Sequence, residues 1–276
     1  MTAREDFTVR FWGVRGSLPS PGASTVKYGG HTSCVEMRCG RHLLIFDAGS
    51  GLRPLGRALG AEAPLAAHLF VTHTHIDHIV GFPFFAPFHS DQSHVTVWAG
   101  HASGVPIERL VGDLFRPPFF PITPQAFRAR VDYRDFANAD CLVCEPGIAV
   151  KTARLNHPGG VTGFRVEFDG RCATYLTDVE HDEARPDPLL VAFVKGADLV
   201  IYDSMYTTAE YPAFRGWGHS TWEDGVRLCE AADAGRLVLF HHAPDRSDGD
   251  LDAIGRDAAG ARPGTIVARE GETLVL

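Results

Sequence analysis

The sequence predicts a mixed α/β (α+β) fold, for three reasons. Short apolar runs rich in β-branched and aromatic residues recur along the 276 residues, and they are continuous and too short for helices, as buried strands are. Segments with helix start and stop signals lie between several of these runs. The composition, 45% hydrophobic and 22% charged, is that of a globular protein.

Several of the predicted strands are followed directly by an aspartate or a histidine. In the first forty residues, which read as strands and turns, Val35, Met37 and Cys39 alternate with polar residues. Five later runs are each followed directly by a metal-binding group: Leu43–Phe46 by Asp47, Leu69–Thr72 by His73, Tyr175–Thr177 by Asp178, Leu199–Tyr202 by Asp203, and Leu237–Phe240 by His241. One such end is usually a turn or a helix cap, but five would converge at one edge of the sheets.

Two helices are expected in the second half of the chain. Ser220 and Glu223 have the spacing of a capping box, which predicts a helix that runs through Ala232 and stops before Gly235. A second helix is expected over residues 187–194, because it too ends near a glycine.

Residues 82–136 differ from the rest of the chain. Phe82–Phe88 and Arg116–Pro121 are dense in Phe and Pro, so a long helix is not expected across either. The segment could form a core edge, a pocket wall or a homodimer interface. Because the sequence has no repeat, low-complexity tract or linker, residues 1–276 are predicted to form a single domain.

Bulk properties exclude several classes of protein. No apolar run approaches the roughly 18 residues that cross a bilayer, and the charged N-terminus lacks the apolar stretch of a signal peptide, so a cytoplasmic protein is expected. The net charge of −8 disfavours a large nucleic acid as partner. The CxxC formed by Cys141 and Cys144 could be half a zinc site, but nothing completes it, and reduced core thiols are the favoured interpretation.

The densest cluster of candidate ligands lies at residues 73–78. His73, His75, Asp77 and His78 fall within six consecutive positions, directly after an apolar run. Imidazole and carboxylate bind zinc and similar metals, so the alternative of a solvated His-rich loop is disfavoured.

His73-Thr74-His75-Ile76-Asp77-His78 resembles the HxHxDH signature of the metallo-β-lactamase fold superfamily. His157, Asp178 and His241 resemble its later motifs in the same order, so that the resemblance covers essentially the whole chain. It implies a four-layer αββα sandwich, a metallo-β-lactamase-like hydrolase domain with two metals at one edge.

The same resemblance implies a ligand set. The first metal takes His73, His75 and His157, the second takes Asp77, His78 and His241, and Asp178 bridges the two. His242 is the alternative to His241, which is preferred because it follows the strand directly. The implied cofactor is two divalent ions, with Zn²⁺ favoured and Mn²⁺ or Fe also suited to such ligands. Two metals about 3.5–4 Å apart lower the pKa of a shared, bridging water and clamp a substrate oxygen.

Departures from two branches narrow the reaction class. Asp178 stands where zinc lactamases of the cysteine-bearing type have Cys, and His75 stands where flavo-diiron proteins have Glu. Both β-lactam hydrolysis of that type and di-iron redox chemistry are therefore disfavoured.

Asp203 and His219 resemble the acidic and His-Ser/Thr motifs of the phosphodiesterase branch, which includes the tRNA 3′-processing nuclease and the cyclic-phosphate hydrolases. There the histidine, oriented by the carboxylate, contacts the phosphate and protonates the leaving oxygen. His219 also precedes the predicted start of a helix, where free N–H groups favour an anion. Packing at a helix start is the alternative. The predicted catalytic residues are Asp77, Asp203 and His219.

Two further residues receive expected roles. Asp47 resembles the superfamily residue that supports the histidine loop without binding metal. Arg15 could reach a substrate phosphate, or it could be a turn or surface arginine.

The sequence thus predicts a two-metal hydrolase for a small or cyclic phosphodiester, with His219 as general acid assisted by Asp203. The first alternative is a tRNA 3′-processing endonuclease, which normally carries a long basic arm that this sequence lacks. A thioester or lactone hydrolase would use the same metals without His219. A non-enzymatic module with a vestigial site should lack ligands, and here none is missing.

Overall fold

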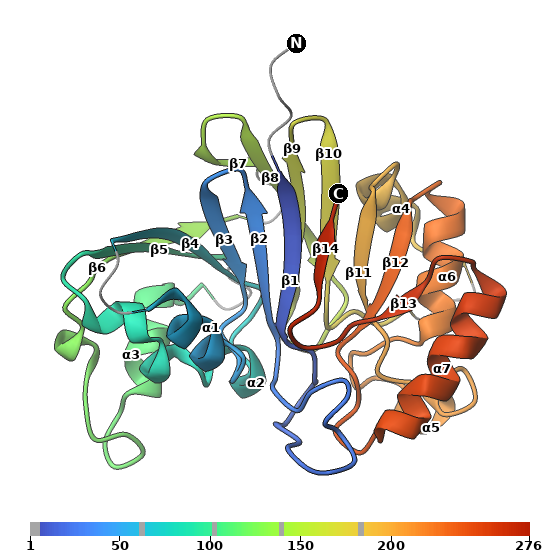
Figure 1. Ribbon diagram of the computed structural model, residues 1–276, viewed down its shortest axis with the longest axis horizontal. Coiled ribbons are helices and arrows are strands. Elements are labelled where there is room, and N and C mark those ends of the chain that lie inside the picture. Colours follow the sequence, from blue (N-terminus) through green and yellow to red (C-terminus); the bar gives the residue numbers. More distant parts are fainter. Residues whose placement is uncertain (1–5, 61–63, 101–103, 138–140, 182–184) are drawn as a thin grey trace.

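The computed structural model describes residues 6–60, 64–100, 104–137, 141–181 and 185–276. Two seven-stranded sheets face each other, and helices cover the outer face of each (Figure 1). The predicted α/β class and the four-layer αββα order are confirmed. Division into one domain over residues 1–276 stays a prediction.

The first sheet has the order β14-β1-β2-β3-β4-β5-β6. Strands β3 to β6 run parallel, while β1 is antiparallel to both β2 and β14. The strands are β1 (Phe7–Gly13), β2 (Cys34–Cys39), β3 (His42–Phe46), β4 (Leu65–Val71), β5 (Ser93–Gly100), β6 (Arg130–Phe136) and β14 (Thr273–Val275).

The second sheet has the order β13-β12-β11-β10-β9-β8-β7. Strands β10 to β13 run parallel, and β7 to β10 pair antiparallel, so β8 points the same way as β10. The strands are β7 (Cys141–Glu145), β8 (Ile148–Leu155), β9 (Val161–Phe168), β10 (Arg171–Leu176), β11 (Leu199–Asp203), β12 (Arg236–Phe240) and β13 (Ile266–Val267).

Helices of the two halves lie on opposite outer faces (Figure 1). Those beside the first sheet are α1 (Leu52–Leu59), α2 (Ile76–Ile79), α3 (Ile107–Leu114) and the 3₁₀ turns η1 (Phe82–Phe84), η2 (Ala86–His89) and η3 (Pro124–Ala126). Those beside the second sheet are α4 (Pro188–Val194), α5 (Tyr211–Phe214), α6 (Trp222–Ala231) and α7 (Asp248–Ala261). No helix in the described ranges is long and apolar enough to span a membrane. The expected cytoplasmic location stays a prediction.

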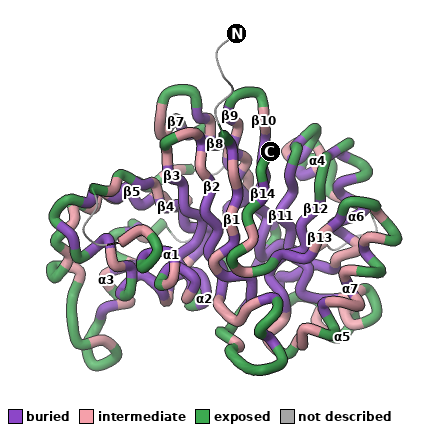
Figure 2. Tube along the Cα trace, viewed as in Figure 1, coloured by how far each residue is buried: buried purple, intermediate pink, exposed green. Residues whose placement is uncertain are grey.

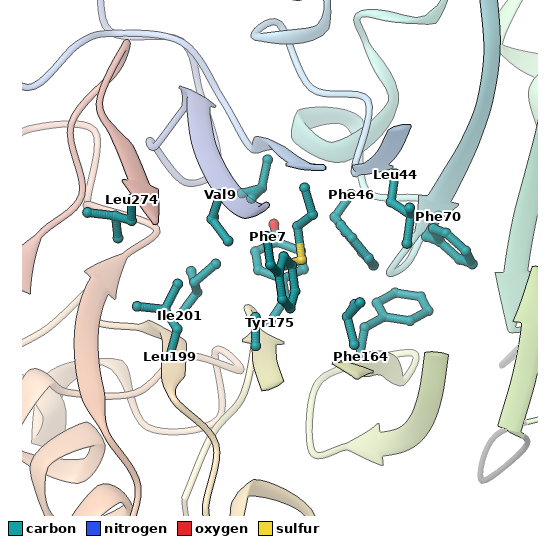
Figure 3. Packing of buried hydrophobic residues seen from close by; sticks show 14 of the residues in the cluster. Phe7, Val9, Leu44, Phe46, Phe70, Phe164, Tyr175, Leu199, Ile201 and Leu274 are labelled. Carbon is teal, nitrogen blue, oxygen red and sulfur yellow. The ribbon is translucent and has the colours of Figure 1, made fainter. Parts of the chain in front are cut away.

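Three hydrophobic clusters separate the four layers. The central cluster lies between the sheets, where Phe46 stacks on Phe70 and the ring of Phe164 packs at an angle against both (Figure 3). A second cluster joins the second sheet to α4, α6 and α7, and a third joins the first sheet to α1, α3 and the 3₁₀ turns. Strands β3, β10, β11 and β12 are therefore buried on both faces, as their continuous apolar runs predict (Figure 2).

The helix after His219 begins one residue later than the sequence predicts. Thr221, not Ser220, is the N-cap of α6, and its capping box is completed by Asp224 rather than Glu223. Ser220 instead donates its hydroxyl to the Val179 carbonyl. This tertiary hydrogen bond removes Ser220 from the cap, and Thr221 provides an equivalent side chain. The helix over residues 187–194 is found as expected, with Asp187 as its N-cap.

The Phe/Pro-rich segment forms mainly the edge of a core. Phe82, Phe85, Phe88 and Phe115 are buried in the third cluster, and no long helix crosses either Pro-rich stretch. Phe119, by contrast, is 87% exposed. A homodimer interface at this side of the molecule stays a prediction.

The expectation of core thiols is wrong for Cys141. Its position in β7 is exposed and Cys144 is half-buried, because β7 is the edge strand of the second sheet. Cys34, Cys39, Cys172 and Cys229 are buried, and all six thiols are free.

Candidate metal centre

Strand direction brings the predicted ligands to one edge of the sandwich. Strands β4, β8 and β10 each end two residues before a candidate ligand, namely His73, His157 and Asp178. Asp203 is the last residue of β11, and His241 directly follows β12. Since parallel strands end at the same edge of a sheet, side chains far apart in sequence meet there.

Five overlapping groups of three candidate ligands form at this edge among the described residues, and two of them match the sets that the resemblance implies. His73, His75 and His157 make the first triad, and Asp77, His78 and His241 make the second. Within each triad, the candidate ligand atoms all lie within 4.8 Å of one another. The short helix α2 contributes Asp77 and His78 and begins directly after His75, its N-cap.

Asp178 lies between the two triads. Its Oδ1 is 3.8 Å from Nε2 of both His73 and His157, whereas its Oδ2 is 3.1 Å from His78 Nε2 and 3.3 Å from His241 Nε2. One oxygen therefore faces each triad, as a bridging carboxylate requires.

The residues present fit two divalent cations. Nitrogen and carboxylate oxygen donors in mixed sets suit Zn²⁺ and similar ions. The buried Nε2 of His73 has no hydrogen-bond partner among the described residues, which is costly unless a ligand satisfies it. The other ring nitrogen donates to the Gly218 carbonyl in His157 and to Asp47 in His78, which turns each Nε2 toward the other candidate ligands.

The backbone is strained at three residues that follow strand ends near the ligand cluster. Asp47, Asp178 and His241 have φ angles of 63°, 55° and 60°, in the left-handed region that residues other than glycine rarely adopt. Such strain persists only where the surrounding structure holds it in place, and it concentrates at functional sites.

The pKa shifts favour the metal-binding form in four candidate ligands and oppose it in one. Burial would lower the pKa of His78, but the carboxylates of Asp77 and Asp178 outweigh burial and raise it well above the ordinary value. Burial lowers the pKa of His73 and His157 and so favours their neutral imidazoles. Burial alone would raise the pKa of Asp77 and Asp178, but neighbouring histidines, above all His78 and His241, hold both well below the ordinary value. Neutral imidazole and ionised carboxylate are the forms that bind metal.

Asp47 occupies the supporting position expected of it. Its Oδ2 accepts hydrogen bonds from His78 Nδ1 and the Tyr175 hydroxyl, both at 2.8 Å, and its Oδ1 accepts from the Thr72 N–H at 2.8 Å. The carboxylate is fully buried beneath the second triad. It therefore fixes the orientation of His78 without facing the ligand cluster.

Asp203 and His219 form a buried pair beside Asp178. His219 Nδ1 donates to Asp203 Oδ2 at 2.8 Å and lies 3.8 Å from Asp178 Oδ1. Burial lowers the pKa of His219, but the Asp203 carboxylate, with Asp178 and Asp77 behind it, outweighs burial and raises that pKa to about 9. The pairing with Asp203 therefore favours the protonated imidazole.

The N-terminus of α6 offers an anion fewer free N–H groups than the sequence predicts. The helix begins at Trp222, and its capping box engages the Asp224 N–H. The Trp222 N–H donates to the Tyr206 carbonyl, so two of the N–H groups expected to be free have partners. Charge on the imidazole, not the helix terminus, is what would attract a phosphate here.

Two residues left open by the sequence lie outside the ligand cluster. His242 is fully buried and forms a 2.9 Å hydrogen bond with the Ala268 carbonyl, whereas its neighbour His241 joins the second triad. Arg15 is also fully buried and donates to the Gly29, Ala243 and Arg246 carbonyls. Arg15 thus ties loops together and does not extend toward a substrate.

Sequence reasoning missed several residues that contact the centre. The sequence pattern identifies Thr72 and Tyr175 only as strand residues, although both donate hydrogen bonds to Asp47. The Ser17 N–H donates to Asp77 Oδ2 at 2.8 Å, and Glu180 holds the segment before His219. These contacts cross 25 to 128 positions of the chain, and nothing in the local sequence marks them.

Comparisons with known proteins place this site in a family context. Residues 42–242 match the family model described as the beta-lactamase superfamily domain. The ribonuclease Z of Natronomonas pharaonis is 24% identical over 96% of this chain and 96% of its own length.

Two solved structures illustrate the likeness in fold. Zn²⁺-bound PqqB from Methylobacterium extorquens aligns with a TM-score of 0.73 and 17% identity, over 98% of this chain and 100% of that chain. A diphosphatase from the PhnP family aligns with a TM-score of 0.72 and 18% identity, over 97% of both chains. At these identities the likeness establishes the fold, and the zinc in PqqB shows that this fold accommodates divalent metal.

Proposed function

Because the chain belongs to the beta-lactamase superfamily domain family and is a metal-dependent hydrolase of the metallo-β-lactamase fold, we propose that it hydrolyses a small or cyclic phosphodiester. The observation that carries this proposal is the buried pair of Asp203 and His219 beside Asp178. Two-metal centres serve many hydrolytic reactions, whereas a protonated imidazole beside one suits a substrate whose leaving oxygen needs a proton.

The proposed cofactor is a pair of divalent ions, with Zn²⁺ favoured. His73, His75 and His157 would hold the first ion, Asp77, His78 and His241 would hold the second, and Asp178 would contribute one oxygen to each. Bound there, the ions would lower the pKa of a water molecule and offset the charge of the phosphate.

The proposed catalytic residues act on the substrate as follows. Asp203 holds His219 through Nδ1, which leaves Nε2 to face the phosphate. Hydrolysis forms a bond between a water oxygen and phosphorus and breaks the bond to the leaving oxygen. His219 donates its proton to that oxygen, and the attacking water releases one proton, which balances the one donated. Asp77, the third proposed catalytic residue, would act by holding the second ion, and the Ser17 N–H donates a hydrogen bond to its carboxylate.

The names of similar proteins support a phosphate ester as substrate, and they also support a second candidate function. The PhnP-family neighbour is a diphosphatase, whereas the full-length relative from Natronomonas pharaonis is named Ribonuclease Z. The latter favours tRNA 3′ processing as the alternative function. Against it stand the net charge of −8 and the lack of a basic arm in the sequence, since large nucleic acids require positive charge.

The test compares substrates and variants on metal-loaded protein. Bis(p-nitrophenyl) phosphate, a 2′,3′-cyclic nucleotide, a precursor tRNA, a thioester and a lactone are assayed with wild type, His219→Ala and His94→Ala. We expect turnover of the 2′,3′-cyclic nucleotide to fall by about 10²–10⁴-fold in His219→Ala, with bound metal retained. The fall on bis(p-nitrophenyl) phosphate should be smaller, because its leaving group needs no proton, and His94→Ala should change neither. His94 is a suitable control because it is a partly exposed histidine that pairs with Asp132 on the first sheet.

Other results of this experiment would contradict the proposed substrate class or the proposed metal ligands. Cleavage of precursor tRNA alone would favour the ribonuclease alternative. Thioester or lactone turnover that is indifferent to His219 would sink the phosphodiesterase proposal. For the metal assignment, Asp178→Ala is expected to bind fewer than two ions per chain, and a full complement of two would refute the bridging role.

A further inference from the structure

Glu180 is a buried carboxylate to which the chemistry above gives no role. It lies two residues after Asp178 and is only 5% exposed. A buried charge is costly unless hydrogen bonds compensate it, so the partners of this carboxylate indicate what it does.

The partners of Glu180 come from one short segment. Its Oε1 accepts hydrogen bonds from the Gly216 N–H at 2.6 Å and the Tyr211 hydroxyl at 2.7 Å, and its Oε2 accepts from the Gly218 N–H at 2.8 Å. Its backbone is fixed as well, because its N–H donates to the Asn156 carbonyl at 2.8 Å. Glu180 thus joins the loop that precedes His157 to the segment that precedes His219.

The segment held by Glu180 contacts both parts of the centre. The Gly218 carbonyl accepts a 2.7 Å hydrogen bond from His157 Nδ1, and His219 is the next residue. Gly218 has a φ of 89°, and a Cβ at this position would lie 2.1 Å from His157 Nδ1. The glycine that permits this close approach also leaves the segment without conformational restraint of its own.

We propose that Glu180 is a positioning residue that holds Gly216 to His219 in register, so that His157 presents Nε2 to the first triad and His219 presents its ring to the leaving oxygen. Charge-assisted hydrogen bonds to backbone N–H groups are stronger than neutral ones, which suits a carboxylate to this task. The part of this inference that concerns His219 rests on the proposed function, whereas the part that concerns His157 rests on metal binding.

The test uses the full chain with Glu180→Ala, Glu180→Gln and, as a matched control, Tyr211→Phe. The control removes one donor to Glu180 and leaves both backbone N–H partners in place. Two quantities are measured: the affinity for Zn²⁺ by competition with a chromophoric chelator, and kcat on two diesters. Bis(p-nitrophenyl) phosphate releases a good leaving group that needs no proton, whereas a 2′,3′-cyclic nucleotide releases an alkoxide that does.

The inference predicts a specific pattern of losses. Glu180→Ala should weaken Zn²⁺ binding by about 10–100-fold, as expected when the partner that orients a ligand is lost. Its kcat should fall at least about 10-fold further on the cyclic nucleotide than on the p-nitrophenyl ester, because only the former depends on the acid. Glu180→Gln, which keeps one acceptor oxygen, should lie between Glu180→Ala and wild type, and Tyr211→Phe should stay within about threefold of wild type.

Unchanged Zn²⁺ affinity together with equal losses on both diesters would overturn the proposal, since a residue that only stabilises the fold would act in that way. If Glu180→Ala does not fold, as judged by circular dichroism, the same comparison is decided by Glu180→Gln. If wild type cleaves neither diester, the proposed function fails, and Zn²⁺ affinity alone then decides whether Glu180 positions His157.

Discussion

Asp47 shows how much of a metal centre can lie beneath its ligands. The carboxylate is fully buried, adopts a left-handed backbone and holds His78, Thr72 and Tyr175 together. Its place after a strand made it noticeable in the sequence, but its partners could not be read there. Residues of this kind fix the orientation of ligands, and their loss weakens metal binding without removing a ligand.

We therefore predict that Asp47→Asn lowers metal affinity by about 10–100-fold, because the amide cannot accept every hydrogen bond that the carboxylate accepts. Metal titration followed by calorimetry measures the change. Asp233→Asn is the matched control, since Asp233 also has a left-handed backbone, with a φ of 48°, but is exposed. Equal affinities of Asp47→Asn and wild type would contradict the supporting role.

Glu270 gives a second prediction at the residue scale, one that concerns stability and pH. Burial raises the pKa of Glu270 to about 7, although the hydrogen bond from the His31 N–H and the Arg15 guanidinium oppose the rise. The folded protein thus holds this proton more tightly than the unfolded chain does. The resulting stabilisation is fully present below the ordinary pKa of 4.5 and is lost as pH rises through about 7.

Glu270→Gln should remove that part of the pH dependence, which we expect to be about 1–3 kcal/mol of unfolding free energy between pH values near 5 and 8. Denaturant unfolding at several pH values measures it, with Glu272→Gln as the control on the same turn. The same pH slope in wild type and Glu270→Gln would show that Glu270 is not the group responsible.

At the scale of the element, α6 shows that a local signal locates a helix better than it locates its first residue. The sequence from Ser220 to Asp224 contains two overlapping capping-box patterns. One pairs Ser220 with Glu223, and the other pairs Thr221 with Asp224. The structure uses the second, because Ser220 is engaged with the Val179 carbonyl. Sequence alone could not decide, since that hydrogen bond joins residues 41 positions apart.

Thr221→Ala should accordingly cost about 1 kcal/mol of unfolding free energy, as is typical when an N-cap side chain is lost. Ser247→Ala, which breaks the equivalent capping box of α7, should cost a similar amount. Glu223→Ala should change stability by less than about 0.5 kcal/mol, because Glu223 is not the capping partner. If Glu223→Ala loses more unfolding free energy than Thr221→Ala, the result would support the capping box of Ser220 and Glu223 that the sequence predicts.

At the scale of the whole molecule, the central cluster unites the two sheets. Phe164 of the second sheet packs against Phe46 and Phe70 of the first, with ring centroids 5.3 and 5.6 Å apart (Figure 3). Neither sheet can bury its inner face without the other. This arrangement favours cooperative unfolding of the chain as one unit, in line with the single domain expected from the sequence.

We predict that Phe164→Ala lowers stability by about 3–5 kcal/mol and that wild type and variant each unfold in one transition. Differential scanning calorimetry compared with circular dichroism tests both statements. Phe119→Ala is the control, because this ring is 87% exposed and its loss should cost less than about 0.5 kcal/mol. Two separate transitions in wild type would contradict the single domain.

The sequence predicted most of the architecture, because the signals for it are local. Continuous apolar runs marked the buried strands, and ligands placed directly after strand ends anticipated which side chains would lie together, including Asp178 and His241. His157 was expected only from the resemblance to the metallo-β-lactamase fold superfamily. Hydrogen bonds between residues far apart in the chain could not be predicted. Tyr175 donates to Asp47 across 128 positions, and the Gly218 N–H donates to Glu180 across 38. The side on which Cys141 lies depended on which strand became the sheet edge, which the sequence does not encode locally.

Asp178 turns one oxygen toward each triad, and that geometry bears on how the centre would fill. A cation in either triad would fix the orientation of a carboxylate that the other triad needs, so each binding event would favour the other, and by the same factor in both directions. Chains with two ions would then outnumber chains with one. At limiting metal, activity would then rise in proportion to the metal added, whereas independent filling of the two triads would make it rise with the square of the metal added.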